Sequence, residues 1–292
     1  MSGESEAIVA GFATQEDGGR LAYEVHGASN TGVPVLLLRP LGGSMTLWRT
    51  FRAILAERSR VIAFDFRGTG RSSPEPLRVS TKSLALEGRS VLDHLGVARA
   101  HVFGISLGGM TATWLAIRDP SRVAKLCIAS APKAGVELTH AGIRRGLGMA
   151  ACFARPVDEV EVSLVDRVLS HEFRQAHPEE LRAIEGLVRA HPATRTALLK
   201  HGAAGALHDA RRHLDAIRAE TLVLAGEHDR LLGTEAPRAL AAAIRGGTFE
   251  IVGQAGHDLT LEQPKVTAQR VARFFADRFS SVVDAGPSSV DA

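Results

Sequence analysis

The ten residues from His101 to Met110 read His-Val-Phe-Gly-Ile-Ser-Leu-Gly-Gly-Met. An apolar run ends at Gly104, and a helical pattern begins just after Ser106. A Gly-x-Ser-x-Gly sequence between a strand and a helix predicts a sharp turn that lifts the serine hydroxyl above the sheet. Side chains two residues before or after the serine would collide with neighbouring backbone, so glycine at both positions fits this turn. We therefore expect Ser106 to be a nucleophile.

A serine hydroxyl is a weak nucleophile until a base removes its proton, and His257 is the candidate base. It lies in residues 253–258, Gly-Gln-Ala-Gly-His-Asp, after the last apolar run and before the last helical pattern. Flanking glycines free the backbone to aim the ring. Asp229, which follows an earlier apolar run, is the expected acid that holds the imidazole tautomer, because the order serine, acid, histidine is typical of this elbow. Glu227 and Asp258 are alternative acids.

Short apolar runs alternate with longer helical patterns, which predicts parallel strands joined by crossover helices. Runs that are apolar at nearly every position suit central strands covered on both faces. Residues 15–19, Gln-Glu-Asp-Gly-Gly, predict a hairpin turn between the first two strands. The expected strands are 8–14, 20–26, 34–38, 60–64, 100–103, 123–129, 221–225 and 248–252. The expected helices are 46–58, 81–95, 107–119, 235–244 and 264–279.

One long segment, residues 132–215, has helical periodicity and no strand run. A helical insertion between two core strands is expected to cover the C-terminal edge of the sheet, where open α/β sheets bind ligands. The sequence thus predicts an α/β core formed by residues 1–131 and 216–279, with a helical cap formed by 132–215. Residues 280–292 are small and polar and are expected to form a frayed tail.

The composition restricts the classes of function. With 292 residues, 45% of them hydrophobic and 23% charged, the chain can bury a large core. The net charge is only +3 and no run of basic residues indicates a nucleic-acid partner. The acidic N-terminus lacks a signal-like apolar region and no stretch is long enough to span a bilayer, so we expect a cytoplasmic protein with no membrane partner. Cys127 and Cys152 form no metal motif, and no phosphate loop is present, so neither a metal nor another cofactor is expected.

The elbow and its partners resemble the α/β-hydrolase superfamily, and the resemblance extends from about Ile8 to Phe279. Residues 65–72, Asp-Phe-Arg-Gly-Thr-Gly-Arg-Ser, are similar to the superfamily's Asp-x-Arg-Gly-x-Gly-x-Ser loop. By this resemblance, Asp65 and Arg67 are expected to tie strand ends together. The implied structure is the α/β-hydrolase fold, with a mostly parallel central sheet flanked by helices and the helical cap inserted in it.

Within the superfamily, the chain resembles 3-oxoadipate enol-lactonases and related carboxylic-ester hydrolases. The similarity lies in Leu41-Gly42, Trp48, the elbow sequence and residues 261–264, Leu-Glu-Gln-Pro. The resemblance implies a cofactor-free enzyme that cleaves a small-molecule carboxylic ester or lactone through an acyl-enzyme. An acyltransferase, or a haloperoxidase or perhydrolase, could use the same triad. A carbon–carbon bond hydrolase of ring-cleavage products and, outside the enzymes, a ligand receptor also remain open, as do the substrate and the oligomeric state.

The loop after the third expected strand departs from the family's pattern. Many relatives have His-Gly where this chain has Arg39-Pro40. The next residue normally lends its backbone N–H to the oxyanion hole, which here implies Leu41, with Leu107 as the second donor. Pro40 has no N–H, but its neighbour supplies the one that is needed. Arg39 either neutralises a substrate carboxylate or holds the strand end, and Trp48 is a further candidate for contacting the substrate.

Overall fold

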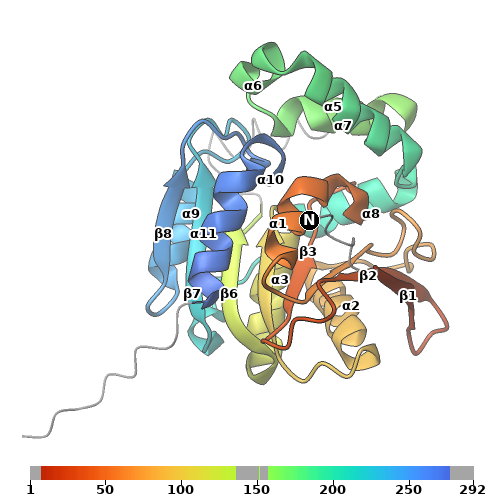
Figure 1. Ribbon diagram of the computed structural model, residues 1–292, viewed down its shortest axis with the longest axis vertical. Coiled ribbons are helices and arrows are strands. Elements are labelled where there is room, and N and C mark those ends of the chain that lie inside the picture. The colour runs from red at the N-terminus through yellow and green to blue at the C-terminus, as the bar shows by residue number, and fades with distance from the viewer. Residues whose placement is uncertain (1–7, 136–150, 152–156, 277–292) are drawn as a thin grey trace, which may run out of the picture.

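The computed structural model describes residues 8–135, 151 and 157–276. An eight-stranded sheet crosses its centre in the order β1-β2-β4-β3-β5-β6-β7-β8 (Figure 1). The pairs β1–β2 and β2–β4 are antiparallel, and all pairs from β4 to β8 are parallel. The strands are β1 Val9–Thr14, β2 Arg20–His26, β3 Val35–Leu38, β4 Val61–Phe64, β5 Ala100–Ile105, β6 Val123–Ala129, β7 Glu220–Gly226 and β8 Thr248–Val252.

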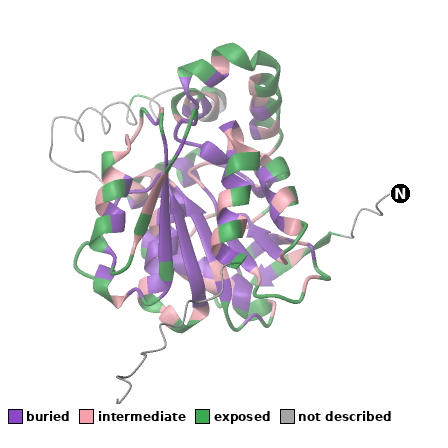
Figure 2. Ribbon diagram, turned by 60° about the vertical axis from the view of Figure 1, so that its left-hand side comes forward, coloured by how far each residue is buried: buried purple, intermediate pink, exposed green. Residues whose placement is uncertain are grey.

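Successive side chains of a central strand enter two separate apolar clusters, one on each face of the sheet. In β3, Leu36 and Leu38 belong to the cluster that contains residues of α2, α3 and α9. Leu37, between them, belongs to the cluster that contains residues of α1 and α11. This alternation is the two-residue period of a strand covered on both faces. The central strands are accordingly coloured as buried in Figure 2. The helices that flank the sheet are α1 Arg49–Ala56, α2 Thr81–His94, α3 Leu107–Arg118, α9 Glu235–Ala243 and α11 Pro264–Ala276.

The segment after β3 differs from the single helix that its periodicity predicts. It begins with a 3-10 turn, η1 Met45–Trp48, and only then continues as α1. Trp48 and Phe51 are buried here and contact the ring of Phe103 on β5. Two further 3-10 turns, η2 Pro120–Arg122 and η3 Leu214–Ala216, and a short helix, α10 Leu259–Glu262, are elements that the sequence patterns do not predict.

The helical insertion between β6 and β7 is confirmed. Of its residues, those that the structure describes form the helices α5 Val157–Val168, α6 His171–Ala176, α7 Pro178–Ala190 and α8 Arg195–Ala206. They stand over one end of the sheet (Figure 1). The chain leaves and rejoins the core side by side, because Gly135 N donates to His208 O and Ala210 N donates to Lys133 O.

The predicted architecture, a mostly parallel central sheet flanked by helices with a helical insertion, is therefore confirmed, while the numerical limits of core and cap remain a prediction. The expected tail at 280–292 and Cys152 lie outside the described residues. Within the part of the chain that is described, no helix combines the length and apolar character needed to cross a membrane.

Candidate active site

Ser106 occupies a sharp turn between β5 and α3. Its backbone has φ of 55° and ψ of −119°, a conformation that residues other than glycine rarely adopt. The turn is held because Ser106 N donates to Ala129 O at 2.9 Å and Met110 N donates to Ser106 O at 3.0 Å. The strained backbone thus belongs to the residue that the sequence identifies as the nucleophile.

Close backbone contacts leave no room for a side chain at either glycine of the elbow. A Cβ atom at Gly104 would overlap the carbonyl oxygen of Gly108. A Cβ atom at Gly108 would overlap the carbonyl oxygen of Leu38, at the end of β3. The overlap with neighbouring backbone therefore explains why glycine occupies both positions of the elbow.

Ser106, His257 and Asp229 form a continuous hydrogen-bonded chain. His257 Nδ1 lies 2.9 Å from Asp229 Oδ2, and His257 Nε2 lies 2.9 Å from Ser106 Oγ. An ionised carboxylate can only accept, so the imidazole proton belongs on Nδ1. Nε2 of the neutral ring is then free to accept the serine proton, which is the orientation that a general base requires.

Asp229 is buried and is fixed from its other side. Its Oδ1 accepts hydrogen bonds from Leu231 N at 2.8 Å and Leu232 N at 2.9 Å. Burial opposes ionisation, but the neighbouring His257 and these two amides hold the pKa of Asp229 below its usual value. The carboxylate that faces His257 is therefore charged at neutral pH.

The two alternative acids make other contacts. Glu227 Oε2 accepts from Gln254 N at 2.9 Å. Asp258 Oδ1 accepts from the backbone N and the hydroxyl of Thr260 and caps α10. Neither carboxylate is hydrogen-bonded to His257 in the structure, so Asp229 is the acid that the geometry favours.

His257 is 2% exposed. Burial alone would lower the pKa of its imidazole, but the charges of Asp229, Asp258 and Glu262 outweigh burial and raise this pKa above the ordinary 6.5. The ring is therefore a stronger base than a histidine in water, and it is neutral only above a correspondingly higher pH.

Two backbone amides near Ser106 are candidates for an oxyanion hole. Leu107 N belongs to the first residue of α3, where the helix provides no acceptor. Leu41 lies in the loop after β3, whose Leu38 and Arg39 carbonyls lie close to Gly108. Among the described residues, neither Leu41 N nor Leu107 N donates a backbone hydrogen bond. Both amides are therefore available to a ligand oxygen.

Arg39 is 1% exposed, and its guanidinium lies over the Trp48 ring at 4.7 Å from the centroid. Within the described parts of the chain, none of its three guanidinium nitrogens has a hydrogen-bond partner. Burial lowers the pKa of Arg39 to about 10, against the opposing charges of Asp65 and Asp258, so the group stays protonated at neutral pH. A side chain at Gly43 would overlap this guanidinium, which therefore packs directly against the loop that carries Leu41.

Trp48 lies beneath the site, in the apolar cluster of α1 and α11. It is 1% exposed, and its indole N–H donates to Thr260 Oγ1 at 2.9 Å. Neither Trp48 nor Arg39 belongs to the described lining of the pocket beside Leu41. Contact with substrate stays a prediction for both residues.

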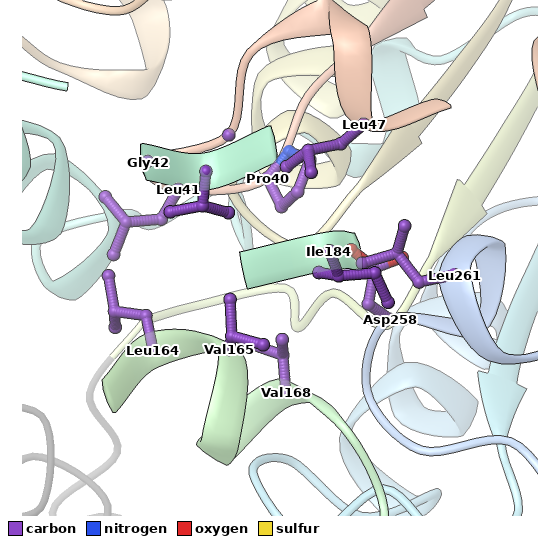
Figure 3. A pocket seen from close by; sticks show the side chains of 12 residues that line it. Pro40, Leu41, Gly42, Leu47, Leu164, Val165, Val168, Ile184, Asp258 and Leu261 are labelled. Atoms are coloured by element: carbon purple, nitrogen blue, oxygen red, sulfur yellow. The ribbon is translucent and has the colours of Figure 1, made fainter. Parts of the chain in front are cut away.

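That pocket lies between the β3 loop and the cap (Figure 3). Its lining is almost wholly aliphatic, and Asp258 is the one ionisable residue among the described lining residues. The lining consists of Pro40, Leu41, Gly42, Gly43, Leu47, Leu164, Val165, Val168, Ile184, Val188, Asp258 and Leu261. A neutral aliphatic group suits this surface.

Asp65 joins the loops that follow β3 and β4. Its carboxylate accepts from Met45 N at 2.7 Å and from Arg71 N at 3.1 Å. Arg67 instead pairs with Asp17, in the hairpin between β1 and β2, at 2.5 Å. Both residues hold loops in place, in agreement with the architectural role expected of them.

Glu262 and Ser170 were not identified as site residues from the sequence. Glu262 lies in the closing tetrapeptide at 261–264, and Ser170 lies within the segment that is predicted to form the cap. The available signal was Ser170 itself, since a serine before a helical segment commonly caps the helix. Its partner on the core, 92 residues further along, has no such local signal.

The comparisons with known proteins agree with this fold. The model of the alpha/beta hydrolase fold family matches residues 33–264. The putative carbamate hydrolase RutD of Caulobacter segnis is 29% identical over 269 residues, which cover 87% of this chain and 96% of that protein. The 2-hydroxymuconate semialdehyde hydrolase of Pseudomonas sp. is 27% identical over 263 residues, covering 87% and 91% respectively.

Among solved structures, the enol-lactonase from Burkholderia xenovorans LB400 superposes with a TM-score of 0.81 at 22% identity. The superposition covers 91% of this chain and 100% of the enol-lactonase, and it is a likeness of fold. The family resemblance predicted from the sequence is thus confirmed, and the chain belongs to the alpha/beta hydrolase fold family.

Proposed function

We propose that this chain is a serine hydrolase that cleaves a small-molecule carboxylic ester or lactone through an acyl-enzyme on Ser106. The observation that carries the proposal is the hydrogen-bonded chain from Asp229 through His257 to Ser106. Two backbone amides, at Leu41 and Leu107, are the candidate oxyanion hole, since neither donates a backbone hydrogen bond among the described residues. A nucleophile, a base, an orienting acid and an oxyanion hole are the four parts that acyl transfer needs.

In the first half-reaction, Ser106 Oγ forms a bond to the substrate carbonyl carbon while its proton passes to His257 Nε2. The carbonyl electron pair moves to oxygen, and the Leu41 and Leu107 amides stabilise this oxyanion. Collapse of the tetrahedral intermediate breaks the bond to the leaving oxygen, which takes the proton from His257. Asp229 stabilises the imidazolium throughout and keeps the ring oriented.

In the second half-reaction, water attacks the acyl-enzyme carbonyl and gives its proton to His257 Nε2. Collapse of this second intermediate releases the acid and returns the proton to Ser106. In a lactone both products are parts of one molecule, so the leaving hydroxyl must move away from the site before water attacks. These steps need no group beyond the side chains and amides named above.

The pocket beside Leu41 supports a neutral aliphatic substituent that extends away from the substrate carbonyl, since its described lining includes Leu41 but neither Ser106 nor His257. Leu41 and Leu47 contribute from the core, and Leu164, Val165 and Ile184 contribute from the cap. No cation belongs to the described lining, and the nearby Arg39 guanidinium is buried against Trp48. A second carboxylate on the substrate would therefore lie among aliphatic groups and near Asp258, which is unfavourable.

Two related reactions are favoured by particular relatives. The similarity to a putative carbamate hydrolase, over 87% of the chain, makes a carbamate the alternative substrate that needs the fewest changes, since its carbonyl would meet the same nucleophile and oxyanion hole. The similarity to 2-hydroxymuconate semialdehyde hydrolase likewise supports carbon–carbon bond cleavage as an alternative.

A substrate panel tests the proposal. Purified protein is assayed on p-nitrophenyl esters of increasing chain length, an aliphatic lactone, an aryl carbamate and a vinylogous diketone. We expect ester and lactone turnover to exceed the other two reactions and to favour aliphatic over carboxylate-bearing acyl groups. Turnover of the carbamate or the diketone alone would contradict the proposal, as would an excess of transfer product when an alcohol competes with water.

A further inference from the structure

A buried carboxylate joins the cap to the loop that carries His257. Glu262, the last residue of α10, is 6% exposed. Its Oε1 accepts from Ser170 N at 2.9 Å, and its Oε2 accepts from Ser170 Oγ at 2.5 Å. Ser170 precedes α6 in the cap, and its hydroxyl also accepts from Phe173 N at the start of that helix. One core carboxylate therefore fixes the first turn of a cap helix.

The same carboxylate contacts the residue that precedes His257. A side chain at Gly256 would overlap Glu262 Oε1, and it would also lie against Ser170 N in the cap. On the other side of His257, Asp258 N donates to Val168 O at 3.0 Å. The backbone of the histidine loop is thus bound to cap residues 168–170 both before and after the imidazole.

Glu262 has the donors expected of an ionised group. Burial raises the pKa of Glu262, whereas the donors from Ser170 and Gly256 oppose this rise. Its two oxygens accept two hydrogen bonds from Ser170, and a protonated carboxyl would lose part of this acceptor capacity. One of these donors is a buried backbone amide, so removing the carboxylate would leave it without its acceptor.

We infer that Glu262 is a positioning residue that couples the seating of the cap on the core to the orientation of the His257 imidazole. The inference rests on the proposed role of His257 as the base for Ser106. When residues 168–170 are seated, Glu262 holds Gly256 and Val168 holds Asp258, so the ring between them is directed at Ser106. When this cap segment leaves the core, the hydrogen bond from Asp258 to Val168 and the contact of Ser170 with Gly256 are lost together, and Glu262 loses the Ser170 donors that fix its position.

Because Glu262 is charged, its proposed role predicts a change in the pH at which His257 titrates, which a purely structural contact would not produce. Three acidic groups face the imidazole: Asp229 after β7, Asp258 beside it, and Glu262 on α10. The Arg39 guanidinium acts on Asp258 from the other side. A negative charge favours the protonated ring, so removing the Glu262 charge shifts the His257 titration toward lower pH.

The test measures Ser106 labelling by a fluorophosphonate as a function of pH, together with amide hydrogen exchange. Glu262→Gln keeps the shape and removes the charge, while Ser170→Ala keeps the charge and removes one donor. Glu250→Gln, on β8 and paired with Arg270 at 3.1 Å, is the matched control for loss of a carboxylate. Labelling needs no knowledge of the natural substrate, and exchange needs no reaction at all.

In Glu262→Gln we expect the acid limb of the labelling profile to move to lower pH by less than about one unit. A charge in direct contact shifts a pKa by about 1–3 units, and Glu262, unlike Asp229, is not hydrogen-bonded to the imidazole. The plateau rate should fall about ten-fold, since small misplacements of a catalytic group are expensive. Exchange should accelerate together in the peptides that cover 168–173 and 255–259. Ser170→Ala should loosen both peptides with a smaller shift of the limb.

A wild-type pH profile in Glu262→Gln, or faster exchange confined to the cap peptide, would overturn the inference. An equal shift in Glu250→Gln would also overturn it, because the effect would then be general to any lost charge. These results differ from failure of the proposed function, in which Ser106 of the wild-type protein would not be labelled at any pH.

Discussion

Two loops approach Ser106 from opposite sides, and they are held in different ways. The β8 loop, residues 253–258, is fixed by directed hydrogen bonds to Asp229 and to the cap, and by close contact with Glu262. The β3 loop, residues 39–44, packs against a buried guanidinium that has no hydrogen-bond partner among the described residues. Hydrogen bonds of the β8 loop orient the His257 imidazole, whereas the β3 loop leaves the Leu41 amide without a backbone acceptor among the described residues.

This difference follows from what each loop has to present. An imidazole acts as a base only in one tautomer and one orientation, so the β8 loop needs partners with fixed geometry. An oxyanion hole needs an N–H that has no partner until the reaction occurs, so the β3 loop must be held by packing instead. Arg39, stacked on Trp48 and against Gly43, supplies that packing and a nearby positive charge.

The largest expected effect is on the hydrogen-bonded side. Asp229→Asn should reduce kcat by about ten-thousand-fold, because an amide no longer fixes the tautomer in which His257 Nε2 accepts a proton. Steady-state kinetics on an activated ester measure this loss. Glu227→Gln is the matched control and should stay within a few-fold of wild type, since Glu227 binds Gln254 N instead. A larger loss in the control would place the acid at Glu227.

A smaller effect is expected on the packed side. Arg39→Met should lower kcat/KM about ten-fold and equally for a carboxylate-bearing ester and its methyl ester, because the guanidinium supports the Leu41 loop and lies outside the described pocket lining. Unfolding in urea should show a loss of about 1–3 kcal/mol, since Asp65 and Asp258 lose the opposing charge.

Arg49→Met, at an exposed position on α1, serves as the control for the loss of an arginine. A loss confined to the carboxylate-bearing ester would instead assign Arg39 to substrate recognition. The two loops would then differ in specificity as well as in the way they are held.

The smallest effect concerns pH. His257 must be neutral to accept the serine proton, and its pKa is raised above 6.5, so activity should fall as the pH drops through that raised value. The acid limb of kcat/KM should therefore have its midpoint above pH 6.5. Profiles from about pH 5 to about pH 9 test this. A midpoint clearly below 6.5 would mean that burial, and not the three acidic neighbours, dominates.

The sheet could be predicted from the sequence because its strands are covered on both faces. The predicted bounds of β6 match the structure, since its seven residues are all buried and mostly apolar. The predicted bounds of the edge strand β8 also match, although only Val252 is buried there. The prediction for β5 stops two residues early, because the elbow glycine at 104 interrupts the run while its backbone still continues the strand. Periodicity could not separate η1 from α1, since both bury one side of the same segment.

In the candidate site, too, the sequence predicts some residues and not others. Ser106, Asp229 and His257 each follow a strand and carry a local pattern, so the sequence indicates them one by one. The bond between Glu262 and Ser170 joins residues 92 apart and depends on how the cap sits, which no local pattern encodes. The burial of Arg39 likewise depends on Trp48 and Gly43, contacts that exist only once η1 has formed.

The central claim is that Ser106 is the nucleophile of a covalent hydrolase. The protein is mixed briefly with a fluorophosphonate, and intact mass and peptide mapping locate the adduct. The account predicts one adduct per chain, on the peptide that contains Ser106, and none in a folded Ser106→Ala variant, whose ester turnover should fall by on the order of a million-fold. An adduct on another serine, or an active Ser106→Ala protein, would contradict it.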